Sequence, residues 1–165
     1  MNKKQAGSNK MYSKDKIILE QLTENDAEFF YDITSRLNYG DNPFLPFESQ
    51  KEFTKRIISF CEFTFTIRMK DNPDIIIGEC ALHSWDKEMK EIEIGGSLYP
   101  DYWGKGLMRS AFDLLAAIAK QNLGIEILRG QTKINNVAAI RLVEKMGFEK
   151  YRIDGDNVIM RKMMS

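Results

Sequence analysis

The sequence predicts an α+β fold with a mixed, mostly antiparallel sheet. Apolar residues alternate over 63–69, a turn signal follows at 71–74, and apolar runs over 75–82 and 90–98 predict an antiparallel meander. A glycine-containing turn, an amphipathic helix and a strand over 125–132 come next and form a β-α-β unit, whose two strands should lie parallel. A meander that passes into such a unit gives a mixed sheet.

Composition favours a compact domain with no net charge. The chain has 165 residues, of which 43% are hydrophobic and 29% charged, which excludes a disordered chain. Basic and acidic residues number 24 each, so no net field attracts nucleic acid or anionic lipid. No apolar run approaches the ~20 residues of a membrane span. We expect a flexible tail over 1–10, a single cytoplasmic domain over 11–165, and no nucleic-acid or membrane partner.

Two capping boxes predict two helices in the first third of the chain: Thr23 with Asp26, and Ser49 with Glu52. The first helix follows a strand over 17–22, and the second precedes the strand over 63–69. That later strand is expected to bury one face and expose the other, which carries Thr64 and Thr66. Phe44 and Phe47, between the helices, are candidates for an acceptor pocket or for the aromatic core.

A glycine turn precedes the long helix that begins near Leu107. Gly104 and Gly106 allow the backbone to turn sharply, so that several N–H groups gather at the helix N-terminus. Such a turn binds an anion, or it is simply a tight structural turn. The spacings typical of dinucleotide-binding and P-loop sites are both absent, so a different phosphate-containing ligand is needed.

Two longer motifs indicate a family. EIGGSLYPDYWGKGLM over 93–108 resembles the acetyl-coenzyme A signature of the GNAT superfamily of N-acetyltransferases, and is most similar to its RimJ/RimL branch. NVAAIRLVEKMGF over 136–148 resembles that family's Asn-led helix, which ends on the pattern Glu-Lys-x-Gly-Phe. The resemblance covers residues 15–163 and implies the GNAT fold, with helices on both faces of the sheet and the parallel unit at a splayed cofactor cleft.

The resemblance also implies which residues contact acetyl-CoA. The strand backbone at 96–98 would pair with the pantetheine arm, and the N–H groups over 104–108 would hold the pyrophosphate, with two cationic side chains nearby. Asn136 would bond the cofactor arm, or serve only as a helix N-cap. The full set is Gly96, Ser97, Leu98, Trp103, Gly104, Lys105, Gly106, Leu107, Met108, Arg109 and Asn136.

Glu93 is the candidate general base, because it lies on the strand beside the cofactor, where burial would raise its pKa. Glu91 shares its face and is an alternative base or a ligand for a cationic acceptor. The alternative interpretation of both residues is a solvated strand face. His83, the single histidine, is a packing group or a base. One histidine and two distant cysteines, Cys61 and Cys80, predict no metal site and two buried thiols.

The general acid is unassigned. Many family members place Tyr where Val143 stands and some place Ser where Ala139 stands, and neither residue here donates a proton. Ser97, Tyr99, Tyr102 and a bound water remain candidates, as does unassisted departure of the thiolate.

The expected function is therefore transfer of an acetyl group from acetyl-CoA, as co-substrate, to a primary amine by direct attack without a covalent enzyme intermediate. The RimJ/RimL resemblance makes a protein N-terminal α-amino group the leading acceptor. Alternatives are a small amine such as a polyamine, an amino acid or a drug, and a catalytically degenerate CoA-binding module. A monomer and a homodimer are both compatible with the sequence.

Overall fold

The computed structural model describes residues 10–37 and 42–164. Residues 1–9 of the expected tail lie outside that part of the chain. The elements, in order, are β1 (Met11–Lys14), β2 (Ile17–Gln21), the 3-10 turn η1 (Glu24–Asp26), α1 (Ala27–Arg36), α2 (Gln50–Phe60), β3 (Phe63–Met69), β4 (Asn72–Asp86), β5 (Glu91–Leu98), the 3-10 turn η2 (Pro100–Tyr102), α3 (Leu107–Leu123), β6 (Ile127–Lys133), α4 (Val137–Lys145), β7 (Glu149–Asp154) and β8 (Asn157–Met163).

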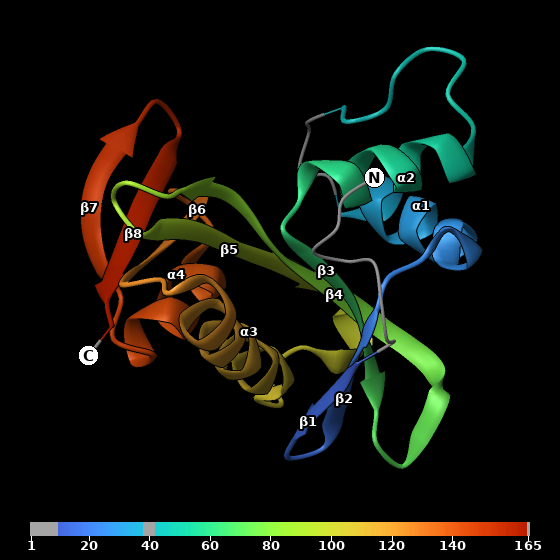
Figure 1. Ribbon diagram of the computed structural model, residues 1–165, viewed down its shortest axis with the longest axis horizontal. Helices are drawn as coiled ribbons and strands as arrows, with labels where there is room; N and C mark the ends of the chain where they lie inside the picture. Colours follow the sequence, from blue (N-terminus) through green and yellow to red (C-terminus); the bar gives the residue numbers. More distant parts are fainter. Residues whose placement is uncertain (1–9, 38–41, 165) are drawn as a thin grey trace.

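The described strands form one open, mixed sheet in the order β1-β2-β3-β4-β5-β6-β8-β7 (Figure 1). All neighbouring strands run antiparallel except β5 and β6, which run parallel. The helix α3 joins these two strands, so the predicted β-α-β unit is confirmed. The predicted α+β class with a mixed sheet is also confirmed.

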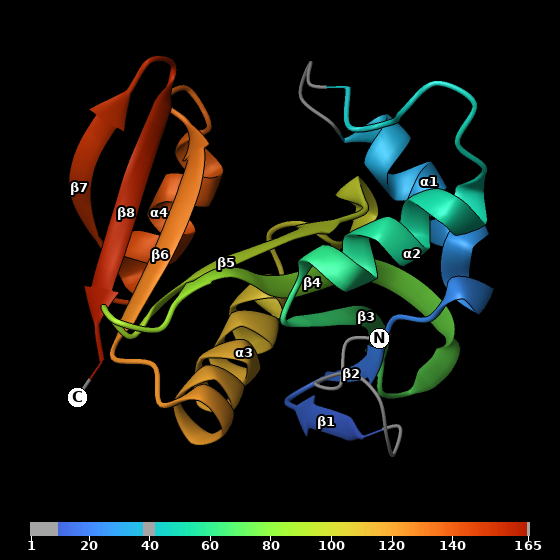
Figure 2. The same ribbon diagram turned by 45° about the horizontal axis from the view of Figure 1, so that its top comes forward.

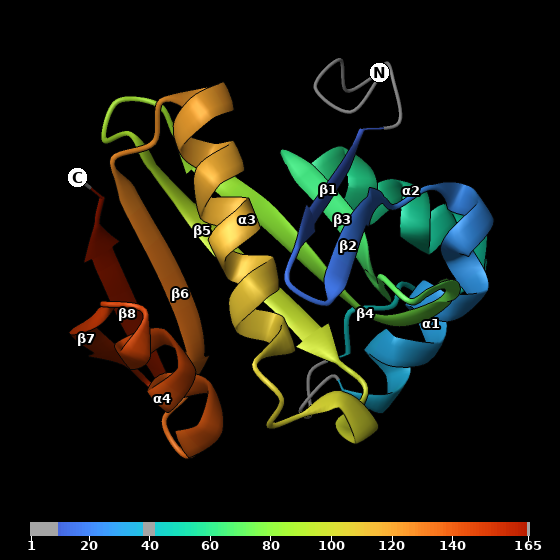
Figure 3. The same cartoon turned by 90° about the horizontal axis from the view of Figure 1, so that it is seen from below.

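Different helices cover the two faces of the sheet. On one face, α1 and α2 pack together around Phe30, Ile33 and Phe53. On the other, α3 crosses the sheet (Figure 3), and Leu115 of α3 and Val143 of α4 belong to the main core. The sheet is therefore buried on both faces at its centre.

Local sequence accounts for the starts of the first helices. Both predicted capping boxes are present: the Thr23 and Ser49 side chains accept backbone N–H groups, and the acids three residues later bond back. The Thr23 box opens η1, which leads directly into α1, whereas the Ser49 box opens α2.

Two expectations about strands need correction. Thr64 and Thr66 are buried, not exposed, because α1 and α2 cover their face of β3. The turn predicted at 71–74 is shorter, since β4 already begins at Asn72. Shifts in the β3–β4 register place Pro73 outside the regular pairing, where its missing N–H costs no ladder bond. The short strand β1 was not anticipated.

Within residues 10–37 and 42–164, no helix combines the length and apolar character that a bilayer span requires.

Candidate functional site

The strands β5 and β6 separate after a short parallel contact (Figure 2). Their pairing ends at Glu93 and Arg129, whereas β5 remains paired with β4 as far as Leu98. The β6 side of β5 over 94–98 therefore has no strand partner among the described residues. Backbone groups along such an edge can pair with an extended, amide-containing ligand as another strand would. The predicted contact residues Gly96, Ser97 and Leu98 all lie on this edge.

Close packing between β4 and β5 explains why residue 96 is a glycine. A Cβ atom at this position would lie 2.7 Å from the Glu79 carbonyl oxygen and 3.0 Å from the Cys80 Cβ. Any side chain would push the two strands apart. The glycine therefore keeps the free edge of β5 straight against β4.

The glycine turn beyond β5 has the predicted left-handed backbone. Gly104 has φ +74° and Gly106 has φ +76°, a region that favours glycine. Gly106 is the N-cap of α3 and provides no side-chain cap, so the first N–H groups of α3 remain available to another acceptor. Leu107 is buried in the core, which leaves only its backbone for a ligand. A helix N-terminus of this kind favours negative charge.

Trp103 connects this turn to the end of β5 by a hydrogen bond. Its indole Nε1–H donates a hydrogen bond to the Leu98 carbonyl oxygen at 2.7 Å. Lys105 places its ammonium 5.7 Å from the centre of the Tyr102 ring, within cation–π range. Arg109 is exposed on the first turn of α3, and Met108 is partly buried against the core. The predicted contacts over 103–109 thus surround one helix N-terminus.

Asn136 is the N-cap of α4. Its Oδ1 accepts the Ala139 N–H at 3.2 Å, and its Nδ2 donates to Thr132 Oγ1 at 3.2 Å. The helix cap, one of the two predicted roles, is present. The Nδ2 group carries a second N–H, which can donate to a cofactor while the bond to Thr132 remains.

Glu93 and Glu91 are not solvated strand residues. Glu93 lies 3.2 Å from Arg129 Nε and 3.4 Å from His83 Nε2, so both of its carboxylate oxygens have a partner. Glu91 lies between Arg129, at 3.1 Å, and Arg161, at 3.2 Å. The two carboxylates and two guanidinium groups form one network across β5, β6 and β8.

His83 stands beside this network on β4, opposite Glu93. Burial lowers the pKa of His83; the Glu93 carboxylate opposes this effect and the Arg129 charge adds to it. Its Nδ1 lies 2.9 Å from Ser84 Oγ. The lowered pKa favours neutral imidazole near pH 7.

Glu79 is a candidate that the sequence analysis missed. It lies on β4 directly opposite Ser97 of β5. Burial raises the pKa of Glu79 to about 7, although a hydrogen bond with the Ser97 side chain partly opposes the rise. The signal in the sequence is a single charged residue within the otherwise apolar run 75–82.

Both cysteines are buried, as predicted, and the two do not form a disulfide with each other. Burial raises the pKa of Cys61 to about 12 and that of Cys80 well above its usual value, with the Glu79 charge adding to both effects. Neither thiol is therefore an activated nucleophile. No cluster of three or more potential metal-ligating side chains occurs in the described residues.

Residues 16–149 match the family described as the acetyltransferase (GNAT) domain. This chain belongs to the GNAT acetyltransferase family. A relative, the uncharacterized N-acetyltransferase YoaA of Bacillus subtilis (strain 168), is 26% identical over 148 residues, which cover 82% of this chain and 81% of that protein. This protein is therefore an acetyltransferase, and GNAT enzymes use acetyl-CoA as the acetyl donor.

Solved structures share the GNAT fold at low sequence identity. Spermidine N-acetyltransferase from Vibrio cholerae, in complex with CoA and spermine, aligns with a TM-score of 0.74 at 20% identity, covering 91% of this chain and 96% of that one. Ribosomal-protein-S5-alanine acetyltransferase from Vibrio fischeri aligns with a TM-score of 0.72 at 17% identity, covering 93% of this chain and 96% of that one. These similarities establish the fold, and the predicted GNAT fold is confirmed.

The two positions at which the resemblance would place a proton donor hold Val143 and Ala139, which have no acidic side chain. Val143 is buried in the core, and the backbone N–H of Ala139 donates to Asn136 Oδ1. Tyr99, one of the candidate acids, donates its hydroxyl proton to Asp32 at 2.6 Å. Burial, followed by this hydrogen bond and the Asp32 charge, raises the pKa of Tyr99 to about 12. Tyr99 is thus a poor proton donor in this arrangement.

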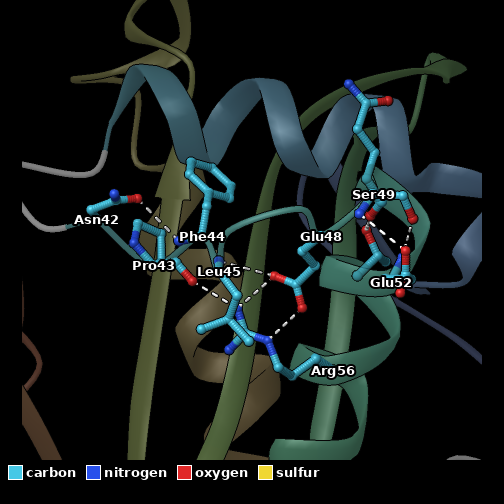
Figure 4. Close-up of polar contacts among 10 residues, drawn as sticks. Asn42, Pro43, Phe44, Leu45, Glu48, Ser49, Glu52 and Arg56 are labelled. Carbon is cyan, nitrogen blue, oxygen red and sulfur yellow. Dashed lines mark hydrogen bonds and ion pairs between the residues drawn. The ribbon is translucent and has the colours of Figure 1, made fainter.

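Polar contacts hold residues 42–49 against the start of α2 (Figure 4). Arg56 of α2 binds both carboxylate oxygens of Glu48, at 2.8 and 3.0 Å, and donates to the Pro43 carbonyl oxygen at 2.7 Å. Phe44 packs into the aromatic core, as one of its two predicted roles required. Phe47 has φ +64° and a fully exposed side chain, so it is not a core residue.

Proposed function

We propose that this acetyltransferase transfers the acetyl group of acetyl-CoA to a primary amine, and that its acceptor is the N-terminal α-amino group of a protein. The observation that carries the donor assignment is the unpaired β5 edge, which leads into the open N-terminus of α3. The acceptor assignment rests on the resemblance of residues 93–108 to the RimJ/RimL branch.

The residues at this edge fit the proposed donor. Backbone groups of 96–98 would pair with the amides of the pantetheine arm, as strands pair. The N–H groups over 104–108 would hold the pyrophosphate, with Lys105 and Arg109 adding positive charge. Asn136 would contact the arm from the start of α4. When bound, acetyl-CoA supplies the thioester that the amine attacks.

We expect the protein to accelerate the reaction mainly by holding the amine against the thioester carbonyl. Positioning of this kind converts a reaction between two molecules in solution into a reaction within one complex. The side chains of Val143 and Ala139 have no acidic proton, so no residue is assigned to protonate the thiolate. Glu93 remains a predicted base whose oxygens already bind Arg129 and His83. We also propose that residues 11–165 act as one cytoplasmic domain, as a monomer or homodimer.

A polyamine is the second candidate acceptor. It is favoured by the fold shared with spermidine N-acetyltransferase and by Glu79 on β4, a carboxyl group for which the described residues provide no cationic partner.

An amine panel tests the proposal. Purified protein and acetyl-CoA are mixed with a peptide bearing a free N-terminal Ala or Ser, with the same peptide blocked at its N-terminus, or with spermidine. CoA thiol release and the mass of the product are measured. We expect release with the free peptide and none with the blocked one. Release with spermidine alone would contradict the peptide assignment, and no release with any amine would reject the proposed acetyl transfer.

A further inference from the structure

An amine reaching the free edge of β5 must approach from the α1–α2 face of the sheet. On the opposite face, Ile94 and Leu98 are buried in the core together with Leu107 and Ala111 of α3. These apolar side chains give a cation no polar partner. Successive residues of a strand point to opposite faces, so Glu93, Gly95 and Ser97 lie on the α1–α2 face.

Glu79 is the carboxyl on this face that lies closest in register to the middle of the free edge. It pairs with Ser97, and its neighbour two positions along β4, Ala81, pairs with Gly95. Beyond Glu93, β5 therefore presents only a glycine and a serine to this face. No large β5 side chain separates the Glu79 carboxyl from the edge.

Most charged groups on the elements around this face already have a partner. On α1, Asp32 binds Arg36 and Tyr99. Three cations of α2 and β3 have an acidic partner, and a fourth, Lys51 of α2, is exposed. Those pairs are Lys55 with Glu24, Arg56 with Glu48, and Arg68 with Glu20 and Asp26. The titratable groups near Glu79 itself are the thiols of Cys61 and Cys80.

No ion pair joins Glu79 to a lysine or arginine in the described part of the chain; the hydroxyl of Ser97 is its hydrogen-bond partner. Buried carboxylates are normally paired, because an isolated buried charge is costly. A cation from outside the protein would supply the missing partner.

We propose that Glu79 receives the ammonium group of the acceptor and takes up its proton before acetyl transfer. The inference rests on the proposed function and names the residue that recognises and activates the acceptor. The ammonium loses one proton to the carboxylate and becomes a neutral amine. As its nitrogen forms the C–N bond, the C–S bond of the thioester breaks; the nitrogen's surplus proton neutralises the thiolate, and Glu79 later releases its own proton to water.

The pKa of Glu79 suits the role of a general base. A general base works best when its pKa lies near the working pH, and that of Glu79 is about 7. Glu93 has a different environment, since Arg129 and His83 occupy its oxygens. In this proposal Glu79 replaces Glu93, the base predicted from the sequence, in contact with the amine, and Glu93 positions His83 and Arg129.

The test compares pH profiles of kcat/KM for the wild type, Glu79→Gln and Ser97→Ala, with Glu149→Gln on the exposed strand β7 as the matched control. Wild-type activity should rise with pH through about 7. Glu79→Gln should lose this rise and lower kcat at pH 7 on the order of 100-fold, with recovery as the pH approaches the amine's own pKa. Ser97→Ala should move the rise to higher pH, because the hydrogen bond that lowers the pKa of Glu79 is removed.

Binding measurements distinguish a wrong role for Glu79 from a wrong proposed function. By calorimetry, Glu79→Gln should bind CoA like the wild type, which also shows that it is folded, and should bind the amine more weakly when saturated with CoA. An unchanged pH profile in an active Glu79→Gln enzyme would overturn the role of Glu79 while leaving the proposed function intact. Absence of wild-type turnover with every amine would reject both.

Discussion

Glu79 differs from the two acidic residues of β5 in its electrostatic environment. Glu91 and Glu93 share Arg129, and Arg161 completes the network. Glu79 has a hydroxyl as its partner and lies on a strand buried at its centre. Ionisation of such a group lowers the stability of the folded state, because water solvates the same charge better in the unfolded chain.

This difference predicts how Glu79→Gln changes stability with pH. The pKa of Glu79 rises from 4.5 to about 7 on folding, so its contribution to stability is full below pH 4.5 and is lost as the pH rises towards 7. At pH 8 the ionised carboxyl should cost about 3 kcal/mol at most. Urea unfolding should find Glu79→Gln more stable than the wild type at pH 8, and equally stable at pH 4. A less stable variant at pH 8 would contradict the burial of the ionised carboxyl.

Individual site residues were predictable where local sequence determines them. The glycines at 104 and 106 have the left-handed backbone that the turn required. The partners of Glu93 were not predictable, because Arg129 reaches it only through the register of two parallel strands joined by α3. Such registers depend on tertiary packing, which periodicity within one segment does not contain.

Among the elements, α4 connects a local cap with the proposed cofactor site. Asn136→Ala should remove the cap bond to Ala139 and lower the free energy of unfolding by about 1 kcal/mol. Asn136→Ser should retain the cap but lack the amide. If Asn136 also contacts the cofactor, both variants will bind CoA more weakly, as measured by calorimetry. Wild-type CoA affinity in the Ser variant would show that Asn136 is only a cap.

The turn before α3 gives a second element-scale prediction. Gly106→Val should place a β-branched residue at φ +76°, at a cost of about 1–2 kcal/mol, and distort the N–H groups proposed to hold the pyrophosphate. The matched control is Gly155→Val in the β7–β8 turn, where φ is +60° and a Cβ also meets no atom within 4 Å. Both variants should lose stability, but only Gly106→Val should raise the Kd for CoA, by tenfold or more. Equal CoA affinities in the two variants would contradict the phosphate site.

Elements with strong local signals were predicted well. Both capping boxes and the boundaries of β3 agree with the sequence analysis, because side-chain caps and alternation act over a few residues. Burial of Thr64 and Thr66 was missed, since it depends on helices packed against their face from elsewhere in the chain. The short strand β1 forms by pairing with β2, and its four residues carry little signal of their own.

At the scale of the whole molecule, the separation of β5 and β6 links fold to function. One face of β5 is filled by α3, the other carries the titratable side chains, and the edge between them is left unpaired beyond Glu93 among the described residues. The order of elements predicted the parallel pair correctly. The point at which the strands separate was available only through resemblance to GNAT enzymes, because no local residue pattern specifies it.

The most direct test of the central claim is a thermal-denaturation titration with acetyl-CoA. A ligand that binds only the folded state should add about 2.7 kcal/mol of stability at 100 times its Kd. We predict a dose-dependent rise in Tm for the wild type, and a rise that needs higher concentrations in Gly106→Val. No rise at millimolar acetyl-CoA would contradict the account, because the free edge of β5 and the glycine turn would then not form a donor site.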